Sequence, residues 1–226
     1  FRRNLVLKNL LDNNFLNSKE YSEIKKMDIE LKKTKKIFLE DAQYYIEDVR
    51  KKIIDDLSYE KVYKQGFNIN TPINLELQKL ANLSLRNGLI KYDKRKGWRG
   101  RIKNKTYNSE WFKDLEDYKL EESIGWKLAI IKKVDQFKVE IETSEKINGI
   151  IEYNDITWTK KEFDELFIKG DIIYVQKING NKYSLKQIPK INGGIVVMDP
   201  YTGRVLALSG GFSFKNSEFN RATQAL

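Results

Sequence analysis

The chain has 226 residues, of which 40% are apolar, and its 42 Lys and Arg against 32 Asp and Glu give a formal net charge of +10. It contains no Cys and no His, which excludes disulfides, thiolate nucleophiles, imidazole- or cysteine-bound metals and a Ser-His-Asp triad. No run approaches the roughly 18–20 apolar residues that a membrane-spanning helix needs. The chain starts on Phe1 without a Met and ends at Leu226 without a Gly or Pro to mark the end of a structural element, so we expect a segment of a longer protein.

The positive charge is concentrated in the first half of the chain. Residues 1–105 carry 25 basic and 14 acidic side chains, whereas residues 106–226 carry 17 and 18. The densest stretch, Lys91 to Lys105, has eight basic residues with Tyr92 and Trp98 between them. It could contact phosphates, anionic lipid headgroups or an acidic partner, although a solvated basic loop is the more common explanation.

The first third of the sequence predicts helices. Leucines at 7, 10 and 11 share one face of a first helix, and Asn17-x-x-Glu20 predicts a capping box for a second. Residues 27–37 show no helical face and are expected to connect. Apolar residues recur every three or four positions from Glu40 to about Leu57, as in an amphipathic helix, and residues 67–71 alternate like a strand after Gly66.

A longer helix is predicted from Asn74, its N-cap, to about Tyr92. Its expected core stripe includes Leu80, and Gly88 within it suggests close packing. The stripe consists of Leu77, Leu80, Ala81, Ser84, Leu85, Gly88 and Leu89.

Short β-branched and aromatic runs then predict strands. They span residues 124–134, 137–143, 149–157, 171–177 and 182–188. Asn179-Gly180-Asn181 is a strong hairpin signal, and residues 159–166 predict a short helix capped by Thr159. Five strands with a helix between the third and fourth favour an OB-type barrel, with a small sandwich or an SH3-like barrel as alternatives.

A second β unit follows Pro189. Residues 194–198 and 204–208 flank the turn Asp199-Pro200-Tyr201-Thr202-Gly203 and predict an antiparallel hairpin. Both strands are apolar on both faces, so we expect a sheet covered on each side.

Candidate chemistry is weak throughout. Ser-x-x-Lys, in which a Lys could activate a Ser, occurs at Ser22–Lys25 and Ser58–Lys61, both in polar sequence that would not depress a Lys pKa. Tyr201-Thr-Gly-Arg204 lacks the Lys of a Lys-Thr-Gly motif. We assign no catalytic, cofactor or metal residue.

The stretch Gly193–Gly211, followed by Phe219-Asn-Arg-Ala-Thr-Gln-Ala225, closely resembles the start of the transpeptidase domain of class A high-molecular-weight penicillin-binding proteins. The positions that carry the resemblance are Asp199, Pro200, Gly203, Gly210, Gly211, Phe219, Asn220, Arg221, Ala222, Thr223 and Gln224. The barrel resembles the OB-like insertion of the "1a" subgroup, and Asn74-Leu75 departs from the Asp-Pro that the family often has.

The resemblance implies an α+β segment with four parts. These are a helical region (1–66), a linker strand with a long helix and basic loop (67–122), an OB-like barrel (123–191) and truncated transpeptidase strands (192–226). The nucleophilic Ser is expected just beyond Leu226, so the segment itself should be inactive and need no cofactor.

The implied parent is a bifunctional peptidoglycan glycosyltransferase and serine-type DD-transpeptidase of the bacterial cytoplasmic membrane, facing the periplasm. β-Lactams would bind the parent, and the barrel would offer a surface to peptidoglycan or a regulatory cell-envelope protein. The alternatives are a standalone OB-fold nucleic-acid-binding module, disfavoured by a barrel with only 12 basic against 10 acidic residues, and a scaffold without a ligand.

Overall fold

The computed structural model describes residues 2–27 and 39–225, which fall into two compact units. The first unit contains α1 (Arg2–Asp12) and α2 (Ser18–Lys26). Asn17 and Glu20 form the predicted capping box at the start of α2, and Leu7 is buried between the helices. The predicted connection at 27–37 lies, apart from Met27, outside the described residues.

The second unit begins with three helical segments. A 3₁₀ turn, η1 (Glu40–Ala42), leads into α3 (Gln43–Leu57), and α4 (Tyr59–Gln65) ends at Gly66, whose φ of 65° favours glycine. The strand predicted at 67–71 is wrong. This stretch belongs to no sheet among the described residues, and Phe67 and Ile69 are exposed, because an alternating pattern makes a strand only where a partner edge is present.

The long helix α5 (Leu75–Lys94) starts as predicted, because the Asn74 side chain accepts hydrogen bonds from the backbone N–H groups of Glu76 and Leu77. Its predicted core stripe is partly wrong, since Leu80 is 58% exposed while Gln78 is 1% exposed. A Cβ on Gly88 would meet open space, so close packing is not the reason for this glycine.

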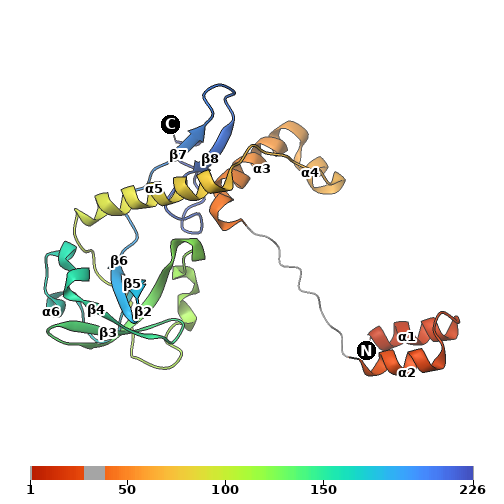
Figure 1. Ribbon diagram of the computed structural model, residues 1–226, viewed down its shortest axis with the longest axis horizontal. Helices are drawn as coiled ribbons and strands as arrows, with labels where there is room; N and C mark the ends of the chain where they lie inside the picture. Colours follow the sequence, from red (N-terminus) through yellow and green to blue (C-terminus); the bar gives the residue numbers. More distant parts are fainter. Residues whose placement is uncertain (1, 28–38, 226) are drawn as a thin grey trace. The chain divides into compact units, whose positions relative to one another are not determined.

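Five strands close into a barrel, as the sequence predicted for an OB-type fold. They are β2 (Trp126–Val134), β3 (Lys138–Thr143), β4 (Asn148–Glu152), β5 (Asp171–Asn179) and β6 (Lys182–Lys186). The order is β5-β2-β3-β4-β6, and β5 pairs with β6 to close the ring (Figure 1). All pairs are antiparallel except β4–β6, and the short β1 (Lys103–Asn104) adds to β5.

The segment between β4 and β5 differs in detail from the prediction. Strand β4 ends at Glu152, and two 3₁₀ turns, η4 (Tyr153–Asp155) and η5 (Thr157–Thr159), replace its predicted end. The helix is only α6 (Phe163–Leu166), and Glu162 rather than Thr159 provides the capping box. Phe163 and Leu166 point into the barrel core, so burial of these two side chains sets where the helix forms.

Two further 3₁₀ turns, η2 (Lys113–Tyr118) and η3 (Glu122–Ile124), lead into the barrel. Together with α5 they cover a second apolar cluster, in which Trp111, Trp126, Tyr174 and Phe212 are buried. Trp126 and Tyr174 are therefore core residues and not exposed stacking platforms.

The last β unit is the hairpin β7 (Ile195–Met198) and β8 (Val205–Ser209), paired antiparallel as predicted. Helix α5 reaches from this hairpin to the barrel (Figure 1). The expectation of a sheet covered on both faces holds for the end of β8, where the successive residues 207–209 are buried, and is wrong for β7. Val196 and Met198 of β7 are 45% and 56% exposed, because α5 and α3 pack mainly against β8.

Candidate functional site around the signature segment

Residues 193–225, here called the signature segment, contain every position on which the family resemblance rests. The turn at its tip is fixed by Asp199, whose carboxylate accepts hydrogen bonds from the Tyr201 backbone N–H at 3.0 Å and from the Thr202 hydroxyl at 2.5 Å. These bonds hold the pKa of Asp199 below its usual value. Gly203 closes the turn with a φ of 70°. The role of Asp199, Pro200 and Gly203 is therefore to fix the conformation of this turn.

Gly210 and Gly211 sit where other parts of the chain come closest. A Cβ on Gly210 would lie 2.2 Å from Asn220 Oδ1, and one on Gly211 would lie 2.4 Å from the Tyr44 hydroxyl oxygen. Neither glycine has a positive φ. The absence of a side chain is what allows Asn220 and Tyr44 to pack against the backbone after β8.

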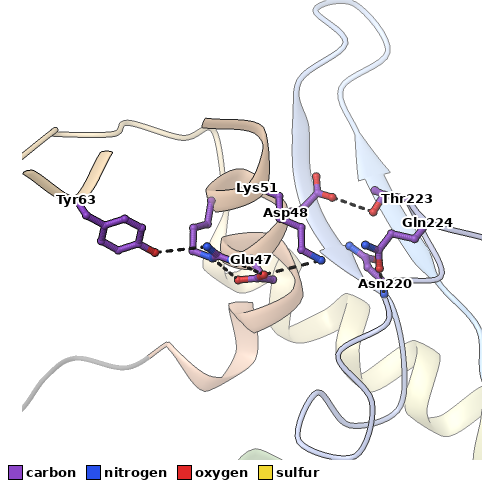
Figure 2. Close-up of polar contacts among 8 residues, drawn as sticks. Glu47, Asp48, Lys51, Tyr63, Asn220, Thr223 and Gln224 are labelled. Carbon is purple, nitrogen blue, oxygen red and sulfur yellow. Dashed lines mark hydrogen bonds and ion pairs between the residues drawn. The ribbon is translucent and has the colours of Figure 1, made fainter. Parts of the chain in front are cut away.

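A tight turn follows at residues 220–224. The Asn220 side chain accepts from the Ala222 backbone N–H at 3.1 Å, while Gln224 Oε1 accepts from the Asn220 N–H at 2.9 Å. Asn220 is 5% exposed, and its Nδ2 has no partner among the described residues. Thr223 donates to Asp48 of α3 at 2.8 Å, which joins this turn to the helix (Figure 2).

Phe219 and Arg221 lie at the surface of the same turn. Phe219 is 48% exposed, and the Arg221 guanidinium lies 5.4 Å from its ring centroid. The guanidinium also donates to the carbonyl of Phe219 at 3.0 Å and to that of Gly210 at 3.3 Å. Arg221 thus ties the turn to the end of β8.

Helix α3 supplies two tyrosines, Tyr44 and Tyr45, to which the sequence prediction gave no hydrogen-bonding role. The Tyr44 hydroxyl lies 2.7 Å from the Ser217 carbonyl oxygen, and the Tyr45 hydroxyl donates to the Val205 carbonyl at 2.9 Å. Burial raises the pKa of Tyr44 to about 12, against the opposing effect of Arg221. Tyr44 therefore stays a neutral donor and fixes the segment.

Helix α5 covers the free edge of β8 with polar groups. The Gln78 amide both donates to the Leu208 carbonyl and accepts from the Leu208 N–H, each at 2.9 Å, as a neighbouring strand would. The Asn74 N–H donates to the Leu206 carbonyl at 2.8 Å, and Asn82 donates to the Asp41 carbonyl at 2.7 Å. Sequence reasoning missed Gln78 and Asn82, although polar residues four apart beside an apolar stripe were a usable signal.

Two further contacts connect the signature segment to the barrel side. Glu121, 8% exposed, accepts from the Ser213 hydroxyl at 2.8 Å and from the Lys215 N–H at 2.9 Å. Arg86 of α5 donates to the Phe212 carbonyl at 3.0 Å and to the Ser123 hydroxyl at 3.3 Å. Residues just before β2 and residues just after β8 are thereby held together.

Three of the eight basic side chains of Lys91–Lys105, those of Arg99, Arg101 and Lys105, form ion pairs with carboxylates of the chain. Arg99 pairs with the buried Asp93 at 2.8 Å, and Arg101 lies 3.3 Å from the fully buried Asp171. Asp93 also accepts from the Gln187 amide at 2.8 Å, which fixes the end of α5 to the barrel. These ion pairs give the stretch a structural role and reduce its free charge.

The described residues offer little catalytic chemistry. Ser22 donates to the Ser18 carbonyl of its own helix, and Ser58 is exposed between α3 and α4. Among residues 2–27 and 39–225, no three His, Cys, Asp or Glu side chains gather as metal ligands. The helices of this part of the chain also include none that could cross a membrane. Neither Ser-x-x-Lys pattern has a buried setting.

Known proteins resemble the chain over its full length. Residues 98–191 match the family described as "Penicillin-binding protein OB-like domain". The penicillin-binding proteins 1A of Rickettsia bellii and Escherichia coli K12 are 34% and 27% identical across all of this chain, which spans 29% and 28% of them. The crystal structure of penicillin-binding protein 1A from Haemophilus influenzae superposes with a TM-score of 0.74 at 28% identity, covering 100% of this chain and 33% of that one.

These matches do not support the alternative of a standalone nucleic-acid-binding module. They assign the barrel to an OB-like domain of penicillin-binding proteins, and they extend through the helices before it and the hairpin after it. The chain therefore belongs to the class A penicillin-binding proteins of the 1a type, of which it represents a segment.

Proposed function

We propose that the chain is the non-catalytic connecting segment of a peptidoglycan synthase, which polymerises lipid-linked disaccharides and cross-links stem peptides. The observation that supports this most directly is the 34% identity to a penicillin-binding protein 1A over the whole chain, together with a span of only 29% of that relative. The polymerising and cross-linking activities would belong to parts of the protein other than this segment.

The role of the segment is to position the start of the transpeptidase domain. Gln78 holds the edge of β8, Tyr44 and Asp48 of α3 hold the chain from Ser213 to Thr223, and Glu121 ties this region to the barrel. The nucleophilic Ser that the family places shortly after Ala-Thr-Gln-Ala would then leave this scaffold at a fixed position.

The proposal extends to location and partners. The protein would act at the bacterial cytoplasmic membrane on the periplasmic side, and β-lactams would acylate the nucleophile of the parent enzyme and not this segment. The barrel surface would receive peptidoglycan or a regulatory cell-envelope protein. The segment would need no cofactor.

A fluorescent penicillin tests the proposal. The 226-residue chain alone should not become covalently labelled, whereas the product of the gene extended beyond residue 226 should be labelled, and excess unlabelled penicillin should prevent this. Labelling of the chain alone would contradict a non-catalytic segment. An extended product without a Ser-x-x-Lys motif after residue 226, or one that stays unlabelled, would refute the assignment to a transpeptidase.

A further inference from the structure

A cavity of about 380 Å³ lies between α5 and the barrel. Lys79, Arg86 and Asn87 line it from α5, and Gln176 and Lys186 line it from β5 and β6. Its volume falls within the range of small-molecule sites, about 300–1,000 Å³. Its lining includes no residue of the turn at 220–224.

The charge in this cavity is unbalanced. Lys79, Arg86 and Lys186 line the cavity with a single carboxylate, that of Asp41, and within residues 39–225 none of the three cations forms a direct ion pair. Glu121 and Asp155 act on Arg86 and Lys186 from outside the lining. Arg86 donates only to neutral groups, the Phe212 carbonyl and the Ser123 hydroxyl, and its Nη2 has no partner in residues 39–225. A partly buried guanidinium without a directly paired carboxylate is unfavourable, so an anion entering the cavity would be stabilised.

The electrostatic environment agrees with this geometry. Burial lowers the pKa of Arg86, and the charges of Glu121 and Asp41 offset only part of that effect. Burial also lowers the pKa of Lys186, and repulsion from Lys94 adds to it. The nearby carboxylates, Glu121 and Asp41 for Arg86 and Asp155 for Lys186, thus offset only part of the effect of burial, and a bound anion would offset more of it.

We propose that this cavity binds a carboxylate of a peptidoglycan strand. The Arg86 Nη2, which has no partner in residues 39–225, can donate a charge-assisted hydrogen bond to a carboxylate, and the amides of Asn87 and Gln176 offer donors and acceptors for neighbouring amide and hydroxyl groups. This inference deepens the proposed function and rests on it. A bound strand would contact α5 and the barrel together, and would thus brace the joint between the barrel and the signature segment.

Isothermal titration calorimetry with a disaccharide–tetrapeptide muropeptide measures the binding. We expect the variant Lys79→Gln/Lys186→Gln to bind about tenfold more weakly or worse, because two of three cations are removed. The control is Lys91→Gln, which removes one positive charge from α5 outside the cavity and should change the affinity less than about twofold. The same muropeptide with its carboxylates amidated should bind the unmodified chain at least about tenfold more weakly.

Three results would overturn the proposal. These are no binding of the muropeptide, an equal loss in Lys91→Gln, or equal affinity for the amidated ligand. An unrelated acidic peptide that binds as tightly would assign the cavity to an acidic protein segment instead. If the double variant unfolds, the amidated ligand on the unmodified chain decides. Penicillin labelling of the extended gene product separates the proposed function from the proposed carboxylate site. Labelling without muropeptide binding would refute the carboxylate site and leave the proposed function standing.

Discussion

Replacing Gln78 by Leu tests whether the edge of β8 depends on a polar side chain inside α5. The substitution introduces an apolar side chain of similar size at a site that is 1% exposed, but it leaves the Leu208 N–H and carbonyl without their 2.9 Å partners. A buried backbone group without a partner costs about 1–2 kcal/mol, so two of them should lower the free energy of unfolding by about 2–4 kcal/mol.

The matched control is Leu80→Ala on the same helix. Leu80 is 58% exposed, so its truncation should cost less than about 1 kcal/mol. Urea unfolding followed by tryptophan fluorescence gives both values from the midpoint at constant m. Hydrogen exchange at the Leu208 amide should accelerate in Gln78→Leu alone. If Leu80→Ala costs as much as Gln78→Leu, the apolar stripe read from the sequence describes the packing of α5 better than the structure does.

Two further predictions concern glycine packing and acid stability. Gly210→Ala would place a Cβ 2.2 Å from Asn220 Oδ1 and should lower the free energy of unfolding by about 3 kcal/mol. Gly88→Ala meets open space in α5 and should raise the free energy of unfolding by about 0.5–1 kcal/mol. Thermal unfolding measures both values, and similar effects of the two substitutions would refute the close approach at Gly210. Burial alone would raise the pKa of Glu142, but hydrogen bonds from Tyr107, Trp111 and Lys132 outweigh it and hold the pKa below 4.5. The stability that the Glu142 carboxylate contributes is present above pH 4.5 and is lost as the pH falls through the lowered pKa, so the difference in unfolding free energy between the unmodified chain and Glu142→Gln should shrink with acidification. A difference that grows below pH 4.5 would contradict this.

The structure also changes how the basic stretch is understood. Its density suggested a surface for phosphates, lipids or an acidic partner, yet Arg99 and Arg101 pair with the buried Asp93 and Asp171. Burial of a carboxylate requires a partner, and these arginines provide it. A further group of cations lines the cavity between α5 and the barrel, where the structure brings together Lys79 and Lys186, which are 107 positions apart in the printed sequence.

Local signals were sufficient for most secondary structure. The capping box at Asn17, the cap at Asn74 and the turn at Asn179-Gly180-Asn181 act through hydrogen bonds and backbone conformations within a few residues, and all three form as predicted. Five strands with a helix before the fourth also favoured an OB-type barrel, and the structure decides against the alternatives by pairing β5 with β6 to close the ring.

The sequence by itself determined the caps, the turns, the barrel and the family signature, because each depends on neighbouring residues or on a contiguous motif. Only the tertiary structure decided that Gln78 is buried and Leu80 exposed, that residues 67–71 form no strand, and where the signature segment is held. Those outcomes depend on which strand edges and unpaired backbone groups are brought next to a residue by segments far away in the sequence. A polar side chain can be buried where another group accepts or donates its hydrogen bonds. The hydrophobic periodicity of one helix carries no information about a hydrogen-bonding group on another segment.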